Sequence, residues 1–183
     1  MKILAQIAAI GILIIVFSCK QAGNNKSTQA TTNNAETTKD SLTIPANKKL
    51  TSIVFGRFCG MCVGECATMY KLDIVNNKLL VDHTDSYWEY RRGTPMKFDA
   101  VINDEKKLLI AKQFLDSIPE QLLHTDKAAE RFGCPDCTDG CGIFVETKCD
   151  TTTKMFLIDY QTSQLSGEIK LFAERLKRII GKL

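Results

Sequence analysis

The sequence lacks the short motifs that identify several large enzyme classes. It has no Gly-rich phosphate loop, no Gly-x-Ser-x-Gly turn for a nucleophilic serine and no His-Glu-x-x-His pair for zinc. Neither Cys-x-x-Cys step is followed by histidine, because Val63 and Thr138 stand there, and this excludes that type of covalent haem attachment. These absences argue against a nucleotide enzyme, a familiar hydrolase or a zinc protease. No residue is predicted to be catalytic.

An excess of charge of one sign is also missing. The 183 residues carry 24 basic and 21 acidic side chains, which gives a formal net charge of +3 at pH 7. Binding to nucleic acid would need basic residues clustered on one face. We therefore expect no nucleic-acid partner.

An apolar run at the N-terminus indicates export. After Lys2 the chain is apolar from residue 3 to residue 17, except at Gln6 and Gly11. A helix that spans a bilayer needs about 20 apolar residues, and this run is shorter and stops at a cysteine. A positive charge followed by a short apolar run is typical of a secretory signal. The sequence therefore predicts a signal peptide over residues 1–18, with an uncleaved membrane anchor as the alternative.

The end of this run, Val16-Phe17-Ser18-Cys19, resembles the lipobox of bacterial lipoproteins, although Phe17 departs from the commonest pattern. The resemblance implies that the signal is cleaved before Cys19 and that acyl chains such as palmitate are attached to this cysteine. Lys20-Gln21 is similar to sorting patterns that imply an outer-membrane anchor facing the periplasm of a Gram-negative envelope. At about 0.8 kcal/mol per buried methylene, two or three acyl chains would make the attachment permanent.

The stretch after the lipobox has almost no large apolar side chain. Residues 19–49 consist mainly of Ser, Thr, Asn, Gln, Ala and Lys. Such a composition cannot bury enough apolar surface to offset the entropy of ordering the chain. We therefore expect a flexible tether over residues 19–49 and a cysteine-rich folded domain over residues 50–183.

Strand patterns dominate the first part of this domain. The expected strands are 51–55, 69–75, 78–83, 87–92, 97–102, 142–147 and 154–160, with a Gly/Cys loop at 56–66. Asn76-Asn77 favours a tight hairpin turn, whereas residues 149–153 suggest a longer connection.

Two helices complete the expected fold. One begins at Asn103 or Asp104 and ends at Pro119. The other lies before Gly181, and its apolar face consists of Ile169, Phe172, Leu176 and Ile179. Hairpins without βαβ crossovers predict an α+β fold with a mostly antiparallel sheet and two amphipathic helices.

The cysteines repeat at a fixed spacing. Cys59, Cys62 and Cys66 each stand 75 positions before Cys134, Cys137 and Cys141. Each triplet precedes two expected strands, and the second strand ends in an aliphatic residue, Asp and a ring side chain, at Val81-Asp82-His83 and Ile158-Asp159-Tyr160. This similarity suggests that the domain is built from two ββα-like halves.

Seven cysteines remain after Cys19, namely Cys59, Cys62, Cys66, Cys134, Cys137, Cys141 and Cys149. Exported proteins meet an oxidising compartment, so we expect structural disulfides, each worth about 2 to 4 kcal/mol. Because seven is an odd number, at least one thiol must be free, bound to metal or paired with another chain.

A metal site is the first alternative to disulfides. Cys59-Gly60-Met61-Cys62 and Cys134-Pro135-Asp136-Cys137 could supply four thiolates to a tetrahedral ion, for which zinc is the best candidate. The gap between the two steps far exceeds the roughly 15–20 residues of compact zinc ribbons, which disfavours this site. We therefore expect no cofactor and keep zinc as the alternative.

Two histidines and three acidic residues could also serve as metal ligands or as groups that tune a thiol. We expect them to be ordinary structural, surface or turn residues: His83, His124, Glu65, Asp136 and Asp139.

A thiol-redox role is the second alternative. Phe58-Cys59-Gly60-Met61-Cys62 resembles the Cys-Gly-x-Cys centre of thioredoxin-like proteins. In those proteins the first cysteine begins a helix, whose dipole lowers the pKa of the thiol. Here Gly64 follows and residues 68–75 alternate as a strand, so that helix is not expected.

Residues 86–92 concentrate the single tryptophan with two tyrosines and two arginines. In a strand, Trp88, Tyr90 and Arg92 would lie on one side, a set that could stack on a glycan or anchor an envelope protein. The alternative is that one aromatic face packs in the core.

The order of strand, Gly/Cys loop and Tyr-bearing strand from Phe55 to Tyr70 resembles small cysteine-containing envelope lipoproteins, and this resemblance implies a fold without an activity. The sequence thus predicts a lipid-tethered, disulfide-stapled binding or structural module. It favours a non-enzymatic role and leaves a metal-binding or redox protein as the alternative.

Overall fold

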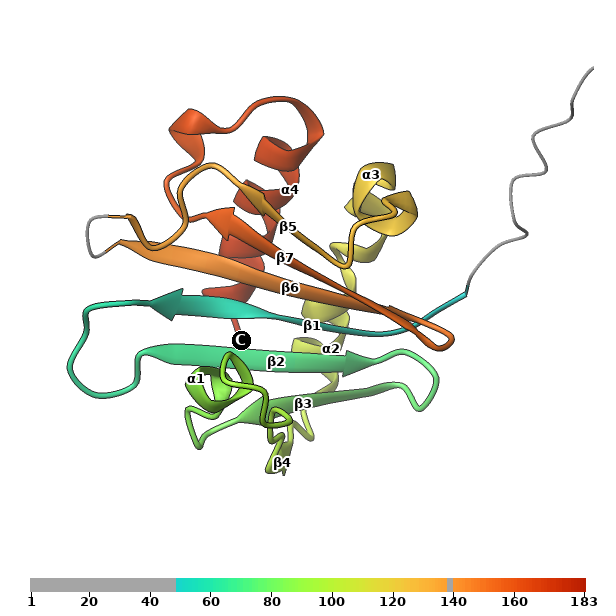
Figure 1. Cartoon of the computed structure of the whole chain (residues 1–183). Helices are drawn as coiled ribbons and strands as arrows, with labels where there is room; N and C mark the ends of the chain where they lie inside the picture. The colour runs from blue at the N-terminus through green and yellow to red at the C-terminus, as the bar shows by residue number, and fades with distance from the viewer. Residues whose placement is uncertain (1–48, 138–139) are drawn as a thin grey trace, which may run out of the picture. The chain divides into compact units, whose positions relative to one another are not determined.

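The computed structural model describes residues 49–137 and 140–183 (Figure 1). The predicted signal peptide, Cys19 and almost all of the predicted tether lie outside the described residues, as do Thr138 and Asp139. The strands are β1 (Leu50–Cys59), β2 (Ala67–Asp73), β3 (Lys78–Asp82), β4 (Ala100–Val101), β5 (Ala129–Phe132), β6 (Cys141–Cys149) and β7 (Thr152–Asp159). The helices are α1 (Tyr87–Tyr90), α2 (Glu105–Lys112), α3 (Glu120–His124) and α4 (Gly167–Ile180). Within these two ranges no helix is long and apolar enough to cross a bilayer.

One seven-stranded sheet forms the centre of the domain. Its order is β4-β3-β2-β1-β6-β7-β5, and each neighbouring pair is antiparallel except β5 with β7. Hairpins supply most of the antiparallel pairs, because a short turn can join only antiparallel neighbours. The predicted α+β fold with a mostly antiparallel sheet is confirmed.

Two hairpins, β2–β3 and β6–β7, lie on either side of the central strand β1. Strands β2 and β6 pair with β1 in the same register. Phe58 of β1 lies opposite Ala67 of β2 on one side and opposite Gly142 of β6 on the other. Ala67 and Gly142 are 75 positions apart, so the cysteine repeat and the hairpin repeat share one spacing. The similarity of the suggested halves thus extends to the pairing of their hairpins with β1, whereas β5 is an additional strand beside β7.

The sheet carries an apolar core on each face. On one face Ile53 and Phe55 of β1 pack with α4 and with the segment from α2 to α3. On the other face Val54 and Phe58 pack with residues of the segment that contains α1. Successive side chains of a strand point to opposite faces, so β1 serves both cores. Figure 1 accordingly shows α2 and α4 on one side of the sheet and α1 on the other.

Both predicted helices form, but the first is shorter than expected. Asp104 caps α2 by accepting hydrogen bonds from the backbone N–H groups of Lys106 (2.9 Å) and Lys107 (3.2 Å). The helix ends at Lys112, and Pro119 stands immediately before α3 instead of ending a helix. The first turn of a helix needs no amide donor from its leading residues, so proline is tolerated there. In α4 the four predicted apolar residues are buried, and Gly181 follows the last turn.

Several strand predictions were wrong. Residues 87–90 form α1 and 91–92 form a turn instead of a strand, and 97–102 contribute only β4. Two residues instead of a longer loop connect β6 to β7. β1 continues through Gly56 to Cys59, beyond the predicted end at residue 55. Glycine is needed at position 56 because a Cβ there would lie 2.0 Å from the carbonyl oxygen of Thr68. β5 was not predicted, since its Ala-Glu-Arg-Phe sequence has neither β-branched residues nor a buried face to mark it.

Candidate functional site

Three disulfides gather at one end of the sheet, where β1 ends and β6 begins. Cys59 pairs with Cys141, Cys62 with Cys66, and Cys134 with Cys137. We call this region, formed by residues 59–66, 133–137 and 140–141, the cysteine end. The predicted disulfide-stapled domain is confirmed. Cys149 is buried at the opposite end of β6, outside these three disulfides.

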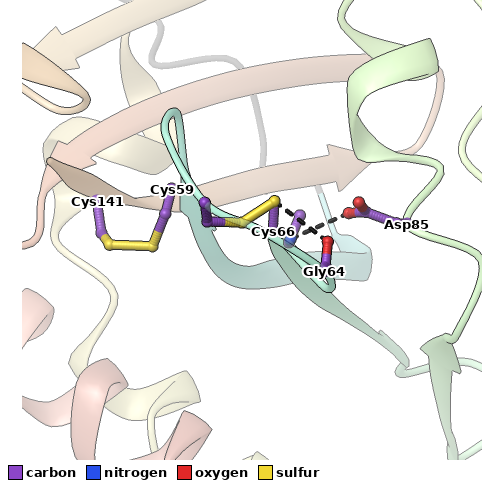
Figure 2. The surroundings of a disulfide bond; sticks show 7 residues. Cys59, Gly64, Cys66, Asp85 and Cys141 are labelled. Carbon is purple, nitrogen blue, oxygen red and sulfur yellow. Dashed lines mark hydrogen bonds between the residues drawn. A yellow bond between two sulfur atoms is a disulfide. The ribbon is translucent and has the colours of Figure 1, made fainter. Parts of the chain in front are cut away.

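The Cys59–Cys141 disulfide joins distant parts of the chain (Figure 2). The two residues are direct partners in the β1–β6 ladder, with Cα atoms 4.0 Å apart and a sequence separation of 82. Cys59 is buried, and its backbone N–H donates a hydrogen bond of 2.8 Å to the carbonyl of Cys66. This disulfide therefore fixes the last rung of the ladder between the two hairpin halves.

The loop between β1 and β2 presents two apolar side chains to solvent. Met61 is 70% exposed and Val63 is fully exposed. The Cys62–Cys66 disulfide closes the loop, and Gly64 turns it with a φ of 96°, a conformation that favours glycine. Figure 2 shows Cys66 Sγ beside the carbonyl oxygen of Gly64, at 3.2 Å. A loop closed in this way has little conformational entropy left to lose when a partner binds.

The second exposed disulfide closes the turn after β5. The backbone N–H of Cys137 donates a hydrogen bond of 3.1 Å to the carbonyl of Cys134. The backbone N–H of Cys134 in turn donates to Oδ2 of the buried Asp159, at 3.0 Å. Pro135 is buried, while both cysteines of the turn are exposed. The turn is therefore held by contacts other than its disulfide.

The two cysteine loops touch each other. The backbone N–H of Gly60 donates to the carbonyl of Gly140 at 3.4 Å. A Cβ at Gly60 would come within 1.9 Å of Asp136 Oδ1, so glycine is needed for this approach. The exposed carboxylates of Glu65 and Asp136 make the surroundings of the apolar tip acidic.

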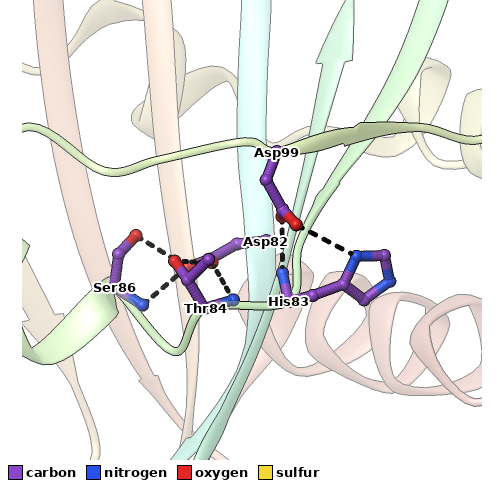
Figure 3. A network of polar contacts seen from close by, with 5 residues as sticks. All are labelled: Asp82, His83, Thr84, Ser86 and Asp99. Carbon is purple, nitrogen blue, oxygen red and sulfur yellow. Dashed lines mark hydrogen bonds and ion pairs between the residues drawn. The ribbon is translucent and has the colours of Figure 1, made fainter.

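The buried carboxylate of Asp82 anchors the segment between β3 and β4, which contains α1 (Figure 3). Asp82 accepts hydrogen bonds from the N–H and hydroxyl of Thr84, both at 2.7 Å, and from the N–H (2.8 Å) and hydroxyl (2.7 Å) of Ser86. The Ser86 hydroxyl also accepts from the N–H of Lys97 at 2.8 Å. Asp85 accepts from the N–H of Ala67 at 3.0 Å and so ties this segment to the start of β2.

The predicted binding residues Trp88, Tyr90 and Arg92 do not share a strand face. Trp88 packs edge-on against Phe58, with ring centroids 6.2 Å apart, and is only partly exposed. Tyr90 packs on the ring of Phe144 and donates a hydrogen bond to Glu146, and Arg92 is exposed. A groove of about 530 Å³ lies beside Tyr90 and Glu146, whose polar groups already bond each other. Trp88 and Tyr90 therefore stabilise the apolar core on the α1 side of the sheet, and packing in the core was the alternative considered for the aromatic residues.

Burial gives these tyrosines a measurable pH response. Desolvation raises the pKa of Tyr87 and of Tyr90 above the ordinary value, and the hydrogen bond to Glu146 raises the pKa of Tyr90 further. An unfolded tyrosine releases its proton at about pH 10, whereas these folded tyrosines keep theirs. Above that pH the folded state binds more protons than the unfolded state, so the free energy of unfolding falls as pH rises.

We therefore expect unfolding in alkaline solution, with tyrosinate absorbance appearing together with loss of the far-ultraviolet circular dichroism signal. Tyr90→Phe removes one of the groups that must ionise, so the midpoint of this transition is expected to move to higher pH. Ionisation of all tyrosines at about pH 10 in a protein that stays folded would contradict the assignment.

The four cysteines considered for zinc are not brought together as a metal site. Each belongs to a disulfide, and the parts of the chain that are described contain no group of three or more His, Cys, Asp or Glu side chains that could hold a metal.

The helix that would follow Cys59 in a thioredoxin-like centre was not expected. In the structure the 60–66 loop follows Cys59 instead, and strand β2 begins at Ala67. His83 lies beside Asp99, 3.5 Å from Nδ1 to Oδ2 (Figure 3), and His124 lies 2.7 Å from Glu120.

The exposed tip of the 60–66 loop was not predicted from the sequence. Apolar side chains between glycines and cysteines were available as a signal, at Met61 and Val63. The residue order could not show whether those side chains point into the domain or into solvent.

Comparison with models of known protein families, with curated proteins and with solved structures finds no match to the chain. Its function is therefore inferred from this site.

Proposed function

We propose that the chain is an exported bacterial lipoprotein, anchored through lipid on Cys19, whose disulfide-stapled domain binds an envelope protein through the tip of the 60–66 loop. The observation that carries the proposal is the exposure of Met61 and Val63 on a loop closed by Cys62 and Cys66. Apolar side chains on a preorganised loop can fill a pocket of a partner at low entropic cost.

A protein suits this surface better than a glycan does. Sugar rings are commonly bound on the open faces of aromatic side chains, but Trp88 is engaged with Phe58 and Tyr87. The tip instead offers aliphatic and thioether groups flanked by the carboxylates of Glu65 and Asp136. A protein with an apolar pocket and a basic rim would complement it.

The position of the tip also supports a partner other than the anchoring membrane. The chain enters the domain at Leu50, at one end of β1, and the 60–66 loop follows the other end (Figure 1). Ten residues of strand separate these ends by about 33 Å, at about 3.3 Å per residue. The binding tip is therefore remote from the point at which the tether joins the domain.

Cys19→Ser is expected to abolish incorporation of labelled palmitate and to prevent signal cleavage, because the lipid acceptor is lost. The measurement is metabolic labelling, with the molecular mass read from the same gel. Cys149→Ser is the control and should keep the label. Retention of palmitate in Cys19→Ser would show that the anchor is elsewhere.

A photocrosslinking amino acid in place of Val63 is expected to give one discrete protein adduct in living cells. The same amino acid in place of Val75 is expected to give none, although Val75 is also an exposed valine (66%) and lies in the turn at the other end of β2. Opening the loop with Cys62→Ala and Cys66→Ala should lower the yield at position 63 about tenfold, since the tip then has to be ordered on binding. Equal adducts at both positions, or no effect of opening the loop, would contradict the proposal.

A further inference from the structure

We propose that the Cys134–Cys137 disulfide is a thiol–disulfide exchange site, which accepts two electrons from an external dithiol while the domain stays folded. This inference goes beyond the binding role of the 60–66 loop and does not depend on it. Both cysteines are exposed, whereas Cys59 of the Cys59–Cys141 disulfide is buried between strands. An attacking thiolate can therefore reach Cys134–Cys137 without unfolding the sheet.

The turn keeps its shape by contacts that reduction would not remove. The bond from Cys137 N–H to the Cys134 carbonyl, the bond from Cys134 N–H to Asp159 and the burial of Pro135 all involve atoms other than sulfur. After reduction the two thiols would remain close to each other. A high effective concentration of one thiol at the other makes re-formation of the disulfide fast.

Folding depends little on this disulfide. Its cysteines are only 3 positions apart, compared with 82 for Cys59 and Cys141. The unfolded-chain entropy removed by a cross-link grows with the length of the loop that it closes, so the shortest loop contributes least. The Cys62–Cys66 disulfide also closes a short loop, but among the described residues no backbone hydrogen bond joins Cys62 to Cys66.

The exchange proceeds in two steps and transfers two electrons to the protein disulfide. One thiolate of the dithiol attacks a sulfur of the Cys134–Cys137 pair, the S–S bond breaks, and its electron pair goes to the other cysteine sulfur, which takes a proton from water. The second thiol of the dithiol then attacks the mixed disulfide and releases the remaining cysteine as a thiol. The protein disulfide is reduced by two electrons, and the dithiol is oxidised to its own disulfide.

The test is stepwise reduction of the oxidised full chain with dithiothreitol, followed by differential alkylation and peptide mass spectrometry. Half-reduction of Cys134–Cys137 is expected at a reductant concentration at least about tenfold below that for Cys59–Cys141, with the fluorescence of Trp88 unchanged between the two steps. Reduction of both pairs in a single step, together with the fluorescence change of unfolding, would overturn the proposal.

Re-formation of the disulfides separates an exchange site from a merely exposed disulfide. After removal of the reductant, Cys134–Cys137 is expected to re-form at least about threefold faster than Cys62–Cys66. Pro135→Gly frees the turn and should remove this advantage, whereas Pro95→Gly, at an exposed proline, should not. Equal rates for the two disulfides in the unmodified chain, or an unchanged rate in Pro135→Gly, would also overturn the proposal.

Discussion

Replacement of both Cys59 and Cys141 by alanine is expected to lower the free energy of unfolding by about 4.5 kcal/mol. The two cysteines are 82 positions apart, and a cross-link that closes a loop of this length removes a large amount of entropy from the unfolded chain. Small domains are stable by only about 5–15 kcal/mol, so the variant would lose about 30% or more of its stability. Urea unfolding followed by the fluorescence of Trp88, the single tryptophan, measures the change.

The matched comparison is the double replacement of Cys62 and Cys66 by alanine. These cysteines are 4 positions apart, and the same loop-closure argument gives a loss of only about 2 kcal/mol. The order of the two effects is the decisive result. Equal losses in both double variants would show that the disulfides do not stabilise the domain through loop closure.

Asp82→Ala is expected to lower the free energy of unfolding by about 3 kcal/mol and to shift the emission of Trp88 to longer wavelength. The substitution removes four hydrogen bonds to a carboxylate, two of which come from the buried Ser86. Thr84 is exposed, so water can replace the two bonds that it donates, whereas the two bonds from buried Ser86 are lost at about 1.5 kcal/mol each. The segment that holds Trp88 over Phe58 would lose its anchor as well.

Asp99→Ala is the control for this substitution. Asp99 also accepts a backbone hydrogen bond nearby, from His83 at 2.8 Å, but it is exposed, so water can replace it. We expect its unfolding curve and the Trp88 emission to match those of the unmodified protein. If Asp82→Ala behaved in the same way, the Asp82 network would not be what positions the aromatic segment.

Local signals predicted most of the regular elements. Asn76-Asn77 marked the hairpin of β2 and β3, and the apolar face of α4 was evident from its spacing. Asn103 or Asp104 was expected to begin α2, and Asp104 is the residue that caps it. Each of these signals acts over a few residues, through a turn, a cap or a helical period. The strand prediction for 87–92 was wrong because aromatic residues suit both a strand and a core. The hydrogen bonds that Ser86 donates to Asp82 hold the chain just before α1.

The candidate site was predicted only in its chemistry. Seven cysteines in a chain predicted to be exported indicated disulfides, and the described residues contain three disulfides. The sequence could not predict which cysteines pair, since the seven cysteines after Cys19 allow many connectivities. The pairing of Cys59 with Cys141 follows from the antiparallel register of β1 and β6, which places these two residues opposite each other.

The sequence by itself determined the class of the fold, its hairpins and helices, and the presence of disulfides, because these depend on residue types and on contacts between near neighbours. The tertiary structure decided the order of the strands, the parallel edge strand β5 and the exposure of Met61 and Val63. These features depend on contacts between residues far apart in the chain. Such contacts form only when the whole sheet has closed around β1, and no short stretch of sequence encodes them.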